Sequence, residues 1–86
     1  MKKNKNQKLP EWFDGTIYDT GDIVVNPFSG EEYKLNAKEL SMYDLLTGIT
    51  YICDHKGWDN ELIELHQKGL DWFRKNNPKA YMVLLD

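Results

Sequence analysis

The segment from Leu35 to Leu40 carries a complete start signal for a helix, and it divides the chain into a β part and a helical part. Asn36 is a favourable N-cap residue, and Glu39 lies three positions later, where a capping box requires a carboxylate. Leu35 and Leu40 occupy the two positions of a hydrophobic staple around this cap. Further apolar residues then follow the 3.6-residue spacing of a helix up to Gly57, where we expect it to end; they are Met42, Leu45, Leu46, Ile49, Ile52 and Cys53.

A second helix is predicted between Asp59, which can cap it, and Asn76-Asn77-Pro78, which ends it. Its apolar face is broad and consists of Leu62, Leu65, His66, Gly69, Leu70, Trp72 and Phe73. The following stretch, Lys79–Leu85, fits either a buried strand or a short helix by its periodicity. Asn77 and Pro78 form a natural N-cap and N1 pair, which favours a third helix.

Two glycines lie inside the predicted helices, where each costs about 1 kcal/mol relative to alanine. Gly48 is nine residues before Gly57, and Gly69 is ten residues after Asp59. In an antiparallel helix pair the two glycines would fall at a similar height. We therefore predict a close helix crossing at Gly48 and Gly69.

The residues before Asn36 have the composition of β structure. Thr16–Tyr18 and Ile23–Val25 are β-rich segments separated by a turn at Asp19–Asp22, and a second turn follows at Asn26–Gly30. Glu31–Leu35 should therefore fold back on Ile23–Val25 as a hairpin. We expect an α+β fold in which this hairpin, extended by a further short strand, packs on the antiparallel helix pair and a C-terminal helix.

A chain of 86 residues has room for one domain. We divide it into a flexible basic arm, residues 1–8, and a single α+β domain, residues 9–86. The arm contains Lys2, Lys3, Lys5 and Lys8, which are four of the eleven basic residues, and no acid. The domain holds the other 7 basic and all 14 acidic residues, a net charge of −7. Such a body does not resemble a duplex-binding domain, whose cations gather on the folded face, but the arm could contact phosphates.

The single cysteine excludes an intramolecular disulfide framework. The basic N-terminus is not followed by an apolar stretch of the kind that a secretory signal contains, and no apolar run reaches the length of a membrane span. These features predict a cytoplasmic protein without contact to membranes.

The strongest candidates for chemistry are Cys53, Asp54, His55, Asp59 and His66, all of which are possible zinc ligands or parts of a cysteine–histidine pair. Cys53 and His55 are two positions apart, about 200° around a helix, and no second cysteine exists. A core cysteine and packing histidines explain these residues more simply. We expect no metal, no cofactor and no enzymatic activity.

The aromatic residues suggest a surface for a partner instead. Eleven aromatic side chains are many for a chain of this length, and the first predicted helix has a second apolar flank beside its main stripe. One of these two faces can pack on the sheet, and we interpret the other as an interface with a partner protein or with a second copy in a homodimer. The predicted partner surface consists of Trp12, Phe13, Leu40, Tyr43, Tyr51 and Trp72.

Three motifs carry a resemblance: Asn-Pro-Phe-Ser-Gly-Glu (26–31), Glu-Leu-Ser-Met-Tyr-Asp (39–44) and Trp-Phe…Asn-Pro-Lys-Ala-Tyr-Met (72–82). With them, residues 12–86 resemble short proteins of tailed phages and marine bacteria for which no activity is established. The motifs define turns, a helix cap and core positions, so the resemblance transfers no functional residue. It implies a virus-encoded accessory factor. We therefore expect a non-enzymatic interaction or adaptor protein, with nucleic-acid association through the lysine arm as the alternative.

Overall fold

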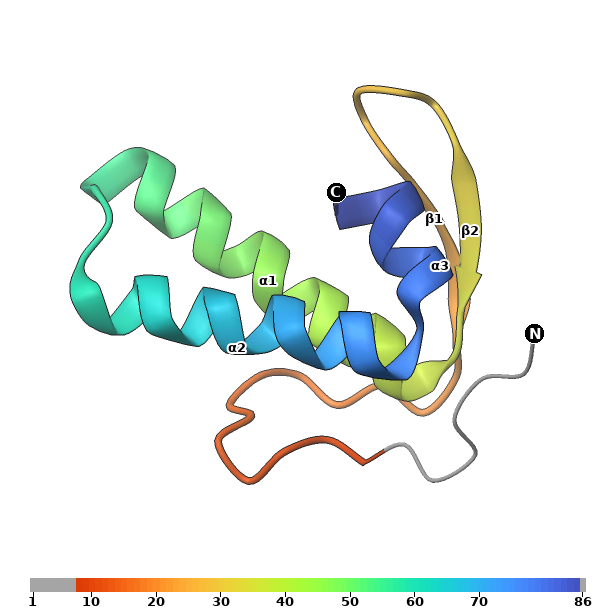
Figure 1. Ribbon diagram of the computed structural model, residues 1–86, viewed down its shortest axis with the longest axis horizontal. Coiled ribbons are helices and arrows are strands. Elements are labelled where there is room, and N and C mark those ends of the chain that lie inside the picture. Colours follow the sequence, from red (N-terminus) through yellow and green to blue (C-terminus); the bar gives the residue numbers. More distant parts are fainter. Residues whose placement is uncertain (1–7, 86) are drawn as a thin grey trace.

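The computed structural model describes residues 8–85, which form a β-hairpin, an antiparallel pair of helices and a short helical C-terminal turn (Figure 1). The elements in chain order are β1 (Asp22–Val25), β2 (Glu32–Leu35), α1 (Ala37–Lys56), α2 (Asn60–Asn76), α3 (Pro78–Ala80) and the π-helical segment η1 (Tyr81–Leu85). The two long helices lie side by side. The hairpin and the C-terminal turn pack together at one end of them, and the N-terminal segment runs along the opposite side of α2 (Figure 1). The expected α+β fold is confirmed.

The hairpin forms where turn residues and β-branched residues predict it. β1 and β2 pair antiparallel, with Val24 opposite Tyr33 and Val25 opposite Glu32. The connecting turn is closed by a hydrogen bond from the Gly30 amide to the Asn26 carbonyl at 2.8 Å, and Gly30 has a φ of 79°, which favours glycine. The sheet of the described residues contains these two strands only.

The further strand expected at Thr16–Tyr18 is wrong. These residues have no regular secondary structure, because the segment runs past the start of α1 instead of along a strand. Its backbone is satisfied by a side chain there: the Tyr18 amide donates to Ser41 Oγ at 2.9 Å. A β-rich composition needs a neighbouring strand to pair with, and among residues 8–85 no strand pairs with this segment.

The predicted start and end of α1 are both confirmed. The Glu39 amide donates to Asn36 Oδ1 at 2.8 Å and the Asn36 amide donates to Glu39 Oε1 at 3.0 Å, which completes the capping box. The helix ends at Gly57, whose φ of 92° is accessible to glycine and whose amide donates to the Cys53 carbonyl at 2.7 Å. α2 begins in the same way, with the Leu62 amide bound to the Asp59 carboxylate.

Only one of the two glycines lies in the helix crossing. Gly69 is buried, and a Cβ atom at this position would lie 2.4 Å from Leu46 Cδ2 on α1. Gly48 is exposed, with no atom within 4 Å of the position of its missing Cβ. The prediction is therefore correct for Gly69 and wrong for Gly48. The buried stripe of α1 runs through Leu46 and Ile49, and Gly48 lies to one side of it.

The C-terminal residues are helical, as Asn77 and Pro78 indicated. Asn77 caps α3 by accepting a hydrogen bond from the Ala80 amide at 3.2 Å. η1 then packs on the hairpin, and the Asn26 side chain donates to the Val83 carbonyl at 2.8 Å. The C-terminal helical turn thus closes the core. The core consists of Leu35, Met42, Leu46, Trp72, Phe73, Ala80 and Leu84.

A buried polar network joins the hairpin to both long helices. Asn77, only 3% exposed, donates to Glu39 Oε2 at 2.9 Å and accepts a hydrogen bond from the Tyr33 hydroxyl at 3.3 Å. Glu39 is fully buried and also caps α1. Glu39 therefore joins the start of α1 to the end of α2, and Asn77 links this pair to strand β2 through Tyr33.

Candidate binding groove

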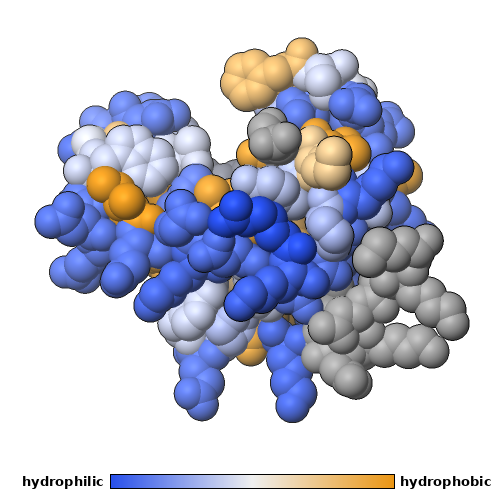
Figure 2. All heavy atoms as spheres, in the orientation of Figure 1, coloured by the Kyte–Doolittle hydropathy of each residue, from blue (hydrophilic) through white to orange (hydrophobic). Residues whose placement is uncertain are grey.

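An apolar groove separates the tip of the β-hairpin from the middle of the helix pair. Its volume is about 250 Å³. It is lined by Asn26, Pro27, Phe28, Tyr43, Leu46, Thr47, Thr50, His66, Leu84 and Leu85. The space-filling view shows a notch between the helix pair and the hairpin tip (Figure 2).

The hairpin tip is held rigidly above this groove. Asn26 Oδ1 accepts hydrogen bonds from the amides of Phe28 and Ser29 at 2.8 and 3.3 Å, while its Nδ2 donates to Val83. One side chain thus shapes the turn and ties it to η1. Phe28 is 98% exposed, so this fixed turn presents an aromatic ring almost entirely to solvent.

The two threonine hydroxyl groups of the helical wall donate hydrogen bonds within α1. Thr50 Oγ1 donates to the Leu46 carbonyl at 3.0 Å, and Thr47 Oγ1 donates to the Asp44 carbonyl at 3.0 Å. Such bonds satisfy a hydroxyl group without exposing it to a ligand. The wall therefore presents mainly methyl and ring carbon to the groove.

His66, which lines the groove, has a pKa shifted from its ordinary value. Partial burial lowers the pKa of its imidazole, so the ring is neutral at pH 7. Its Nε2 lies 3.4 Å from Thr50 Oγ1, and the ring packs edge-on against Trp58 with the centroids 5.3 Å apart. A neutral, packed ring suits an apolar binding surface better than a charged one.

The other candidates for chemistry do not converge on a site. Cys53 is buried in the core face of α1, and burial raises the pKa of its thiol, with Asp59 and Asp54 adding to the effect. His55 stays on its own helix, where Nδ1 lies 2.9 Å from the Tyr51 carbonyl. Within residues 8–85, no three His, Cys, Asp or Glu side chains are placed so that they could hold a metal ion.

The predicted partner surface is dispersed in the structure. The assignment of Trp72 to this surface is wrong, because Trp72 is only 8% exposed and belongs to the core. Phe13 and Leu40 are half-buried against that core, and Trp12 packs on it from the N-terminal segment. Tyr51 is 66% exposed at the far end of α1. Only Tyr43 of the six lines the groove.

Of the predicted basic arm, Lys2, Lys3 and Lys5 lie outside the described residues. Lys8 is exposed, and its carbonyl accepts a hydrogen bond from Trp72 Nε1 at 2.9 Å. The chain is therefore fastened to α2 at the point where the predicted arm ends.

Phe28 was missed as a candidate site residue, because sequence analysis interpreted it only as part of a turn. The sequence of the turn nevertheless indicated that this ring would be exposed. An aromatic residue between Pro27 and Ser29 in a tight turn has few neighbours to bury it, since turns lie at the surface. Leu84 and Leu85 could not be placed in the groove before the packing of η1 was known.

Comparison with protein-family models, with curated proteins and with solved structures finds no match to this chain. The resemblance to proteins of marine phages and bacteria thus remains a prediction. Among residues 8–85, no helix combines the length and the apolar character needed to cross a bilayer.

Proposed function

We propose that this protein is a non-enzymatic interaction module that binds an apolar segment of a partner protein between the hairpin tip and the helix pair. The observation that carries the proposal is the position of Phe28, 98% exposed on a rigid turn at the rim of an apolar groove. Covering a phenylalanine ring of this kind contributes roughly 1.5–3 kcal/mol. Large aromatic residues at fixed positions are typical anchors of protein interfaces.

The volume of the groove matches that of one or two side chains of a bound peptide. Sites for drug-sized molecules usually measure about 300–1,000 Å³, and this groove holds about 250 Å³. One or two apolar side chains of a peptide would occupy that volume. The floor residues Leu46 and Leu84 are 1% and 7% exposed, so the ligand would meet packed carbon and little water.

Selection of peptides from a random library, displayed against the full chain, tests this function. We expect peptides with one or two large apolar residues, whose addition shifts the NMR signals of Tyr43, Thr50 and Leu84. Phe28→Ser should lower the affinity at least tenfold, because it removes the exposed ring and touches no core residue. Thr47→Arg, a substitution at an exposed position of the groove, should weaken binding as well.

Ile17→Ser is the matched control, since Ile17 is 69% exposed and does not line the groove. Its affinity for the selected peptides should equal that of the wild type. Equal losses in Phe28→Ser and Ile17→Ser would refute the proposal. A dimer seen by light scattering that Phe28→Ser dissociates would replace the foreign partner with a second copy of this chain.

A further inference from the structure

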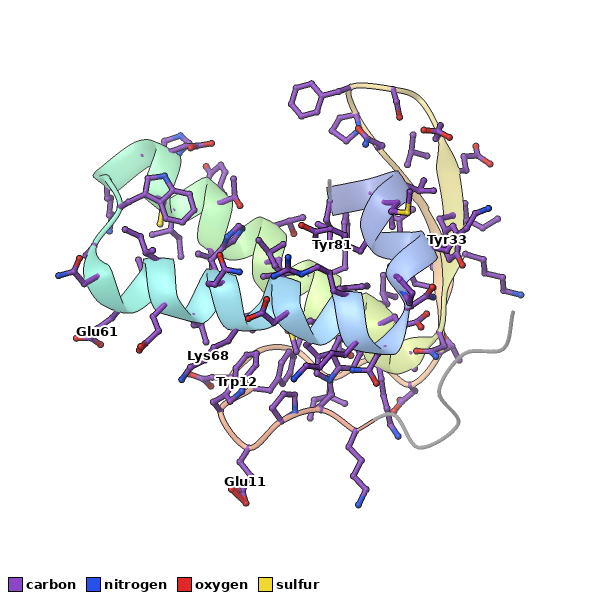
Figure 3. All side chains as sticks on the ribbon, in the orientation of Figure 1. Glu11, Trp12, Tyr33, Glu61, Lys68 and Tyr81 are labelled. Atoms are coloured by element: carbon purple, nitrogen blue, oxygen red, sulfur yellow. The ribbon has the colours of Figure 1, made fainter. Side chains whose placement is uncertain are left out.

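A second open depression lies on the other side of α2, where the N-terminal segment crosses this helix. Its volume is about 310 Å³, and it is lined by Pro10, Trp12, Lys68, Asp71, Trp72, Lys75 and Asn76. In the side-chain view, Trp12 and Lys68 lie next to each other below α2, and Glu11 points away from the helix (Figure 3). The hairpin tip is on the opposite side of α2 from the N-terminal segment (Figure 1).

The cations that line this depression are two exposed lysines of α2, Lys68 and Lys75. The charge of Lys75 also helps to lower the pKa of Asp71, whose main partner is Arg74. The backbone of Lys8 is fastened beside the depression through its carbonyl, which is bound to Trp72. Two lysines therefore share the depression with the half-buried ring of Trp12.

The one acid that lines the depression is compensated. Asp71 accepts hydrogen bonds from Arg74 and from Gln67, and the Arg74 contact holds the pKa of its carboxyl below the usual value. The carboxylate is thus ionised but paired with an arginine on its own helix. The local charge is positive although the body as a whole carries −7.

We propose that this face binds single-stranded nucleic acid, with a base stacked on Trp12 and phosphates held by Lys68 and Lys75. Flat rings flanked by cations are the usual construction of such sites, because every base has a face that can stack. A duplex would be repelled by the acidic surface around it, whereas a single strand needs only this narrow strip.

Fluorescence anisotropy with a labelled 15-nucleotide single strand and the full chain tests the proposal. We expect binding that weakens steeply with salt. The double variant Lys68→Ala/Lys75→Ala should reduce the slope of log affinity against log salt by about 1.4, since each phosphate contact to a single strand contributes about 0.7. The double variant Lys34→Ala/Lys56→Ala removes two exposed lysines elsewhere and should leave the slope nearly unchanged.

Trp12→Leu should weaken binding by about 5- to 150-fold, which corresponds to ~1–3 kcal/mol of stacking on one base. Leucine keeps an apolar contact with the core, and a two-dimensional NMR spectrum shows whether the variant folds. If it does not, a shift of the Trp12 indole signal in the wild-type protein on adding the strand replaces this measurement.

Three results would overturn the proposal. The first is an equal effect of the two lysine double variants. The second is binding that disappears when Lys2, Lys3 and Lys5 are replaced but is insensitive to Lys68 and Lys75, because the arm alone would then suffice. The third is equal affinity for a polyglutamate peptide or for anionic lipid vesicles, which would show that charge acts without stacking.

Discussion

Replacing each of the two helical glycines by alanine separates helix propensity from packing. Alanine in a helix interior is favoured over glycine by about 1 kcal/mol, and this gain is the same in both variants to a first approximation. At Gly48 a methyl group meets no atom within 4 Å, so Gly48→Ala should stabilise the protein by roughly the full amount. At Gly69 the methyl group would lie 2.4 Å from Leu46 Cδ2, so the side chain of Leu46 must move.

Leu46 is only 1% exposed and has little free space to move into. Inserting a methyl group into such a core costs about 1–3 kcal/mol, which offsets the propensity gain. We therefore expect Gly69→Ala to be neutral to about 2 kcal/mol less stable than the wild type. The difference between the two variants equals the steric cost alone, because the propensity terms cancel.

Urea unfolding followed by far-ultraviolet circular dichroism measures this difference. For a domain of this size 1 kcal/mol corresponds to a shift in Tm of roughly 4–8 °C, so thermal unfolding gives an independent value. The slope of the urea transition should be the same in both variants, since neither changes the surface exposed on unfolding. Equal stability of Gly48→Ala and Gly69→Ala would refute the close contact between α1 and α2.

Three further predictions concern the buried network, the groove and the start of β1. Asn77→Ala should lower the free energy of unfolding by about 2–3 kcal/mol, because buried Glu39 loses a donor, whereas Tyr33→Phe should cost about 0.5–1.5 kcal/mol; similar losses in urea unfolding would contradict this. The pKa of His66 is lowered by burial, so the unfolded chain binds its proton more readily and stability should fall as the pH drops below about 6.5; His66→Gln should flatten this part of the profile between pH 7 and 5.5. Gly21→Ala would place a methyl group 1.9 Å from the backbone carbonyl oxygen of Leu35. The loss of stability should therefore reach or exceed ~3 kcal/mol, the largest usual cost of overpacking a core. A near-native Tm of this variant would contradict the prediction.

The elements that local chemistry specifies were predictable from the sequence. The capping box at Asn36 and Glu39 acts between residues three positions apart, and the stop at Gly57 depends on one residue's own φ. Neither depends on how the rest of the chain packs. The same holds for the turn at Asn26–Gly30, which is closed by its own hydrogen bonds.

The burial of individual aromatic residues could not be predicted in this way. Trp72 and Phe28 have similar apolar character, yet one is 8% and the other 98% exposed. The difference arises because Lys8 and the N-terminal segment cover α2, whereas η1 stops short of covering the hairpin tip. The groove is therefore a product of contacts between distant segments, and no pattern within a single segment encodes it.

Two long-range hydrogen bonds have a consequence for how the molecule assembles. They join Trp72 to Lys8 and Asn26 to Val83, which are 64 and 57 positions apart. The β-hairpin closes over a short loop, and isolated hairpins and helices form within about 0.1–10 μs. Contacts between distant segments pay a larger loop-closure entropy and form later. We therefore expect the β-hairpin and the two long helices to form early, and the groove to exist only after the final folding step, when η1 docks on the turn of Asn26.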